Sequence, residues 1–393
     1  MAEDPSDWDI ETKSVRGGMA RSPYGEISEA LYLTQSFAYD SAQAADERFA
    51  GGPGFIYQRF GNPTTQMFED RLALMEGAEV CRATASGMSA VHVALTGLLK
   101  AGDHLIAGRA LFGSCRWIIS EWMPRFGVET TYVDATDLEA WKNAVRPNTK
   151  VFLIESPANP LLEVTAIGAV AEIARAAGAK LIVDNVFATP IFQKPLALGA
   201  DIVVYSATKH IDGQGRVLGG AILGGAELMT EAYKDILRHT GPAMSPFNSW
   251  VLVKALETLE LRVLRQTQNA GKVADVIASS GKVRQTIYCG RPDHPQAAII
   301  ANQMTGGGNV IAFDLGSRAA AWRFLDALEI IDISNNLGDA KSMATHPCTT
   351  THRSMPEAER LEIGLTEGWV RMSVGLEGPR DLSRDVSRAL DAA

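Results

Sequence analysis

Between residues 61 and about 225 the sequence alternates short apolar runs with amphipathic segments. Helical patterns lie in QMFEDRLALMEG, which Gly77 ends, in GMSAVHVALTGLLKAG and in AIGAVAEIARAAG. The apolar runs are HLIAG, ETTYVD, VFLIES, KLIVDN, IVVYS and AILGG. Strands that alternate with helices at this spacing form a mostly parallel sheet with helices on both faces. We therefore expect an α/β domain over residues 61–250.

Two further regions flank this domain. Residues 1–60 hold many Gly, Pro and Ser residues and lack a long period, which predicts an extended arm that contacts a neighbouring subunit. Residues 245–280 form a long helical stretch. We expect it to lead into a smaller C-terminal α+β domain over residues 251–393.

Composition excludes several classes of protein. The formal net charge of −9 argues against a nucleic-acid partner, which calls for a basic face. No apolar run reaches the roughly 18 residues that a membrane span needs, and the acidic N-terminus is unlike a signal peptide. The four cysteines are far apart and form no CxxC pair, so we expect a reducing, cytoplasmic location.

Polar side chains follow several of the predicted strands. Asp184 follows KLIV, Asn159 lies in the loop after VFLI, and Ser206, Thr208 and Lys209 follow IVVY. In a parallel sheet, ligands bind beyond the carboxyl ends of the strands. The sequence therefore predicts that these side chains converge at one rim.

Lys209 is the most informative of them. A lysine at the end of a buried strand is costly unless it is used, although a surface lysine is the ordinary alternative. Hydroxyls rather than carboxylates flank it. In a partly dry pocket its pKa falls, and a neutral amine forms a Schiff base with an aldehyde such as that of pyridoxal 5′-phosphate (PLP).

A PLP site needs three further groups, and each has a candidate with a structural alternative. Asp184 is placed to hold the pyridine nitrogen protonated, or it caps a helix. The pair Ser86–Gly87 at a helix start suits a phosphate, or it is a plain helix cap. Phe112 is placed to cover the ring, or it belongs to the core.

Five motifs occur in an order that resembles the Cys/Met-metabolism PLP enzymes: YQRFGNPT, SGMSA, VDN, YSATKH and VRMSVGLE. The similarity runs from about residue 20 to the C-terminus. That family includes cystathionine γ-synthases, cystathionine and methionine γ-lyases and homoserine-ester sulfhydrylases. The resemblance implies an aspartate-aminotransferase-like fold (fold type I), PLP as cofactor, and a homo-oligomer, a tetramer built from dimers with shared active sites.

The resemblance also implies a role for each matching residue. Lys209 joins the cofactor and moves protons, Asp184 pairs with the pyridine nitrogen, and Phe112 stacks on the ring. The phosphate is bound by Ser206, Thr208, Gly87 and Met88, and by Tyr57 and Arg59 of the neighbouring subunit, where Tyr57 also assists catalysis. Arg371, Asn159 and Asn336 bind the substrate. The guanidinium of Arg371 suits this role because its two N–H groups can pair with both oxygens of a carboxylate.

Two departures from the family pattern narrow the activity. Phe112 stands where tyrosine is usual, so the ring keeps its cover but loses a hydroxyl. Asn336 takes the place of a serine, and NLGDAKS resembles the sulfhydrylase branch. The compact length is similar to that of O-succinylhomoserine sulfhydrylases, which implies replacement of succinate by sulfide to give homocysteine. A γ-synthase and a γ-lyase are the alternatives, and the acetyl and phosphoryl leaving groups stay open.

Other classes have weaker support. His346, Cys348 and His352 in THPCTTTH match no standard zinc spacing, so we expect no metal. A nicotinamide-dependent oxidoreductase calls for a GxGxxG motif after the first strand, and none is found there. A PLP-binding regulator without turnover is the remaining alternative.

Overall fold

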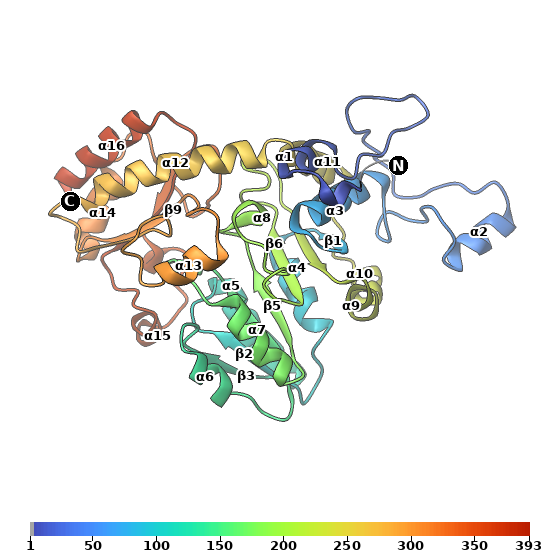
Figure 1. Cartoon of the computed structure of the whole chain (residues 1–393), viewed down its shortest axis with the longest axis horizontal. Coiled ribbons are helices and arrows are strands. Elements are labelled where there is room, and N and C mark those ends of the chain that lie inside the picture. The colour runs from blue at the N-terminus through green and yellow to red at the C-terminus, as the bar shows by residue number, and fades with distance from the viewer. Residues whose placement is uncertain (1–3) are drawn as a thin grey trace.

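The computed structural model describes residues 4–393, so the first three residues of the predicted arm lie outside the described residues (Figure 1). The larger sheet has seven strands in the order β1-β7-β6-β5-β4-β2-β3. Their bounds are β1 Val80–Thr84, β2 His104–Gly108, β3 Glu129–Val133, β4 Thr149–Glu155, β5 Lys180–Asp184, β6 Ile202–Ser206 and β7 Gly220–Gly224. All pairings are parallel except those of β7, which runs antiparallel to β1 and β6.

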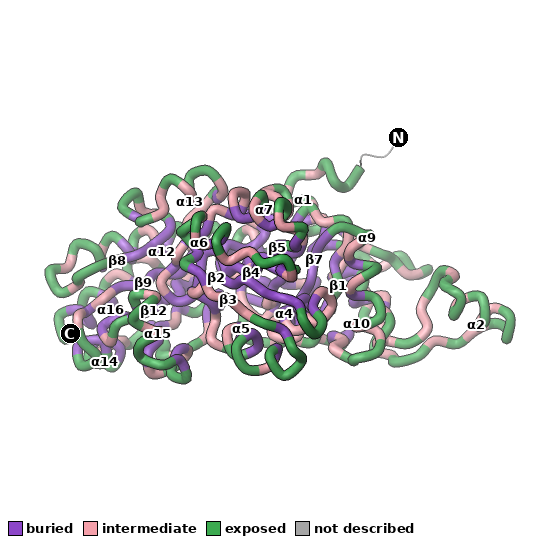
Figure 2. Tube along the Cα trace, turned by 90° about the horizontal axis from the view of Figure 1, so that it is seen from below, coloured by how far each residue is buried: buried purple, intermediate pink, exposed green. Residues whose placement is uncertain are grey.

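This sheet is buried on both faces, as its continuous apolar runs predict. Successive residues of a strand point to opposite faces. On one face Leu105 and Leu153 pack in a cluster with helix α4 (Gly87–Thr96). On the other face Ile106 and Phe152 pack in a cluster with Trp141 and helix α7 (Ile167–Ala176). The predicted α/β class, with a mostly parallel seven-stranded sheet, is confirmed, and Figure 2 shows the strands as the buried interior.

The helices follow the predicted segments closely. Helix α3 begins after the cap Asn62, whose side chain accepts hydrogen bonds from two first-turn N–H groups, and ends at Gly77 with φ of 83°. The bounds of the helices in this half of the chain are α1 Ile10–Arg16, α2 Ala42–Phe49, α3 Pro63–Glu76, α4 Gly87–Thr96, α5 Gly113–Trp117, α6 Leu138–Asn143, α7 Ile167–Ala176, α8 Thr189–Phe192, α9 Ala226–Leu228 and α10 Lys234–Thr240.

The remainder of the chain forms a second α+β unit. Its five-stranded sheet has the order β10-β11-β12-β9-β8, with β8 Gln285–Ile287, β9 Val310–Asp314, β10 Asp332–Ile333, β11 Met343–Thr345 and β12 Trp369–Ser373. Its core includes Phe313, Phe324 and Val386. Helix α11 Pro246–Leu256 still packs against α3 in the core of the larger sheet. Helix α12 Leu259–Ala278 leads from there into the second unit, which also holds α13 Ala297–Gln303, α14 Arg318–Asp326, α15 Glu357–Glu362 and α16 Pro379–Ala392. The single helical stretch expected over residues 245–280 is thus two helices, and the domain boundaries stay predictions.

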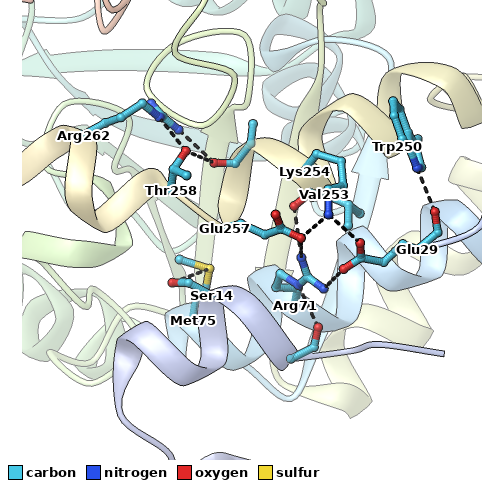
Figure 3. Close-up of polar contacts among 12 residues, drawn as sticks. Ser14, Glu29, Arg71, Met75, Trp250, Val253, Lys254, Glu257, Thr258 and Arg262 are labelled. Carbon is cyan, nitrogen blue, oxygen red and sulfur yellow. Dashed lines mark hydrogen bonds and ion pairs between the residues drawn. The ribbon is translucent and has the colours of Figure 1, made fainter. Parts of the chain in front are cut away.

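The N-terminal region has little regular structure, and its helix α2 projects from the rest of the chain (Figure 1). One buried ion pair anchors the segment near residue 29. The Arg71 guanidinium on α3 binds the Glu29 carboxylate and donates to the carbonyl of Gly17 at 2.8 Å (Figure 3). Lys254 on α11 donates to the same carboxylate at 3.0 Å. Removing one partner of such an ion pair destabilises the fold, because the remaining charge stays buried without a partner.

Among residues 4–393, no helix has both the length and the apolar character that crossing a membrane requires.

Candidate active site

A cavity of about 280 Å³ opens at the carboxyl ends of β4, β5 and β6. Its position is the one expected for a ligand of a parallel sheet. The lining includes ten of the residues singled out from the sequence: Ser86, Gly87, Met88, Phe112, Asn159, Asp184, Ser206, Thr208, Lys209 and Arg371. The structure therefore brings together groups from both sheets that are far apart in the chain.

Lys209 lies in the turn that follows β6, and its Nζ donates to Asn336 Oδ1 at 2.6 Å. Burial, with a smaller contribution from the nearby charge of Arg371, lowers the pKa of Lys209 from 10.5 to about 8. A substantial part of this amine is therefore neutral near pH 7.5. Asn336 does not itself line the cavity but holds the lysine that does.

Asp184 is the last residue of β5. Its Oδ1 accepts the N–H of Val186 at 3.1 Å within the turn after the strand. Asp184 does not cap a helix, because the next helix, α8, begins after Ala188. Burial raises the pKa of Asp184. A cationic ring nitrogen placed next to it would offset that cost, since an opposite charge favours the ionised carboxyl.

The start of α4 lies in the cavity lining. Ser86 caps the helix, and its hydroxyl accepts the N–H of Ser89 at 3.2 Å. The first N–H groups of a helix have no partner within it, and they face an anion favourably. A Cβ on Gly87 would lie 2.5 Å from Cβ of Ser206, so only glycine lets this helix start approach the end of β6. Thr208 also lines the cavity, and its hydroxyl accepts the N–H of Gly219 at 3.1 Å.

Arg371 comes from β12 of the second sheet and is 2% exposed. Its Nη1 donates to Asn159 Oδ1 at 2.9 Å, and its Nη2 donates to the carbonyls of Asn335 and Asn336 at 2.8 and 3.2 Å. The buried Nε has no partner among the described residues. An unpaired donor at a cavity suits a substrate carboxylate.

Tyr57 and Arg59 do not reach this cavity within their own chain. Tyr57 is 39% exposed, and the Arg59 guanidinium donates to the carbonyl of Arg238. A role at a neighbouring subunit's site stays a prediction.

The structure groups the possible metal ligands of this loop differently from the sequence. His346 and Cys348 lie with Glu367, rather than with His352, and their ligand atoms are within 4.8 Å of one another. These groups are already paired: Glu367 accepts from Arg318 at 2.7 Å, and Nε2 of His346 lies 2.9 Å from the carbonyl of Glu367. A carboxylate neutralised by arginine is a poor ligand for a cation.

The lining also includes residues that the sequence reasoning did not single out, among them Glu155 and Asn335. Glu155 is the last residue of β4, in the register position beside Asp184. The rule that singled out Asp184, a carboxylate directly after an apolar run, would have found it. No comparable signal marks Asn335, which contributes a main-chain carbonyl.

The residues present fit PLP by three observations. A buried amine of lowered pKa and a buried carboxyl line one cavity. A helix start held close by Gly87 offers N–H groups to a phosphate. Phe112 supplies an apolar wall. These are the amine, counter-charge, cradle and cover that PLP requires.

Comparison with known proteins agrees with this fit. The family model for Cys/Met metabolism PLP-dependent enzymes matches residues 11–391. The O-succinylhomoserine sulfhydrylase of Mycobacterium tuberculosis (strain CDC 1551 / Oshkosh) is 51% identical, covering 96% of this chain and 95% of the relative. That of Pseudomonas aeruginosa PAO1 is 45% identical, covering 98% and 95%. L-Methionine gamma-lyases match at 36–39% identity.

A solved structure carries the cofactor. It is a putative O-acetylhomoserine (thiol)-lyase from Campylobacter jejuni that contains a pyridoxyl-lysine monophosphate. Its TM-score is 0.94 at 28% identity, with 98% of this chain and 100% of that chain covered. The chain belongs to the Cys/Met metabolism PLP-dependent enzyme family.

Proposed function

We propose that this enzyme replaces the succinyl group of O-succinylhomoserine with sulfide, giving homocysteine and succinate. The observation that carries the proposal is a cavity shared by Lys209, Asp184 and Arg371 in a chain that is half identical to an O-succinylhomoserine sulfhydrylase over nearly its whole length. We further propose that the chain works in the cytoplasm, which its four free cysteines support.

Arg371 binds the α-carboxylate of the substrate through its free Nε, while Asn159 and the two main-chain carbonyls hold the guanidinium in place. This fixes the substrate Cα near Lys209, because both residues contact Asn336. Positioning of this kind supplies a large share of enzymatic rate.

PLP, when bound, supplies an aldehyde that joins amines and a protonated ring that accepts electrons from Cα. Asp184 holds the proton on the ring nitrogen. Lys209, as a neutral amine, would take the proton from Cα and pass it on to the bound cofactor, which leaves the amine neutral again. Lys209 or a neighbouring group would then take a proton from Cβ as succinate leaves from Cγ. Hydrosulfide adds at Cγ, and Lys209 returns the protons. A tethered amine with a pKa near the working pH suits both directions of transfer.

Ser206, Thr208 and the N–H groups at Gly87 and Met88 bind the phosphate in this proposal. Tyr57 and Arg59 of a neighbouring subunit complete that site, which requires at least a dimer. The exposed side chain of Tyr57 supports a role outside its own chain.

The test supplies purified protein with O-succinylhomoserine and sulfide and measures homocysteine and succinate. We expect equal amounts of both, and neither from Lys209→Ala. Formation of 2-oxobutyrate without homocysteine would instead assign a γ-lyase. Cystathionine formed from added cysteine in preference to homocysteine would assign a γ-synthase. Faster turnover of the O-acetyl ester would contradict the proposed leaving group.

A further inference from the structure

Glu155 places a second carboxyl group at the rim of the cavity, beside Asp184. The two residues are register partners at the ends of adjacent parallel strands, so their side chains point to the same face. Both line the cavity, and Glu155 is 5% exposed.

The two oxygens of Glu155 have separate partners. Oε2 accepts the N–H of Phe112 at 2.7 Å, and Oε1 accepts the N–H of Asn159 at 2.8 Å. Phe112 is the apolar wall of the cavity, and the Asn159 side chain accepts from Arg371. One carboxyl group therefore joins the segment that covers the cavity to the segment that holds the guanidinium.

Burying this carboxyl group lowers the stability of the folded state. Burial and the charge of Asp184 raise the pKa of Glu155, and the hydrogen bonds from Phe112 and Asn159, with the charge of Arg371, offset this only in part. An uncharged side chain of the same size would be cheaper to bury. A residue that is unfavourable for stability and lines a cavity is a candidate for function.

We propose that Glu155 is a positioning residue that fixes the spacing between the ring cover at Phe112 and the carboxylate clamp at Arg371. It sets where the substrate carboxylate sits relative to the cofactor ring. The inference rests on the proposed roles of Phe112 and Arg371, but it does not depend on which ester the enzyme uses.

The variant Glu155→Gln tests this. Glutamine keeps the shape but has one acceptor oxygen and a donor NH₂ group, so only one of the two N–H bonds survives. Glu163→Gln is the matched control. Glu163 lies in the loop that follows β4, and burial raises its pKa too, but it does not line the cavity.

The readout is carboxylate recognition without turnover. Glycine and glycinamide, which lacks the carboxylate, are titrated into each holoenzyme, and the cofactor absorbance band gives two dissociation constants. The ratio of the glycinamide dissociation constant to the glycine dissociation constant measures how strongly Arg371 favours a ligand with a carboxylate. We expect this ratio to fall about tenfold in Glu155→Gln, the size expected for the loss of one hydrogen bond that positions the clamp, and to stay unchanged in Glu163→Gln. The visible circular dichroism of the cofactor should change in the first variant only.

A purely structural role gives a different result. In that case Glu155→Gln has a lower melting temperature, but its ratio of dissociation constants and its visible circular dichroism are unchanged. That outcome would overturn the proposal. If Glu155→Gln does not fold, Glu155→Asp is read in the same way, since its shorter side chain cannot reach both N–H groups. If no homocysteine forms, only the proposed reaction is refuted. The proposal for Glu155 is tested separately, because glycine binding needs no ester substrate.

Discussion

Replacing Arg371 by methionine should change the pH at which Lys209 captures the cofactor. Burial and the charge of Arg371 together lower the pKa of Lys209 from 10.5 to about 8. At pH 7 a pKa of about 8 leaves about 10% of the amine neutral, roughly 300 times more than an unperturbed lysine. Only the neutral amine attacks an aldehyde, so the capture rate should follow this fraction.

The size of the effect can be bounded. The pKa of Lys209 lies about 2.5 below its usual value, and burial is the larger of the two causes. Removing the charge of Arg371 should therefore raise the midpoint by less than about 1.2 pH units and slow capture at pH 7 by at most about 15-fold. The exposed Arg265 provides a control, Arg265→Met, which should leave the midpoint unchanged.

The assay mixes cofactor-free protein with PLP by stopped flow and records the rise of the visible absorbance between pH 6 and 10. The wild-type rate should titrate with a midpoint near 8. A wild-type midpoint near 10.5, or an equal midpoint in the Arg371 variant, would refute the reasoning that the pocket tunes this amine.

Three further predictions concern binding and stability. Asn159→Ala removes the hydrogen bond to Arg371, which is worth about 1.5–3 kcal/mol. The KM for the amino-acid substrate should therefore rise at least about tenfold, while the affinity for PLP stays the same. An unchanged KM would contradict the role of Asn159 in holding Arg371. Arg71→Met leaves the Glu29 charge buried without its main partner and should destabilise the protein by about 3–5 kcal/mol in urea unfolding, against a negligible change for an exposed arginine. Burial raises the pKa of Glu69 from 4.5 to about 7, so the folded state prefers the protonated form. Stability should thus fall by up to about 3 kcal/mol as the pH rises from 4.5 to 7, and Glu69→Gln should lack this fall; a parallel fall in both proteins would rule out Glu69 as its source.

The larger sheet and its rim were largely predictable from the sequence. Apolar runs bounded by polar groups gave six of its seven strands, and the residues after them gave Asp184, Ser206, Thr208 and Lys209. The strand β1, with sequence VCRAT, was missed because an exposed Arg82 interrupts a short run at the sheet edge. Edge strands pair on one side only, so their apolar pattern is weak.

Features that depend on tertiary contacts were harder to predict. The helical stretch near residue 257 divides into two helices, yet neither Gly nor Pro marks the break in the sequence. Arg371 was placed at the site by family resemblance alone, because no local pattern shows that β12 meets the loop of Asn159. Asn335 acts through its main-chain carbonyl, which any residue offers.

Mapping the cofactor linkage tests the central claim most directly. The holoenzyme is reduced with borohydride and digested, and the modified lysine is identified by mass spectrometry. The account predicts a pyridoxyl group on Lys209 of the wild-type protein, at one per chain, and none in Lys209→Ala. A modified lysine elsewhere in the chain, or an undiminished adduct in the variant, would contradict it.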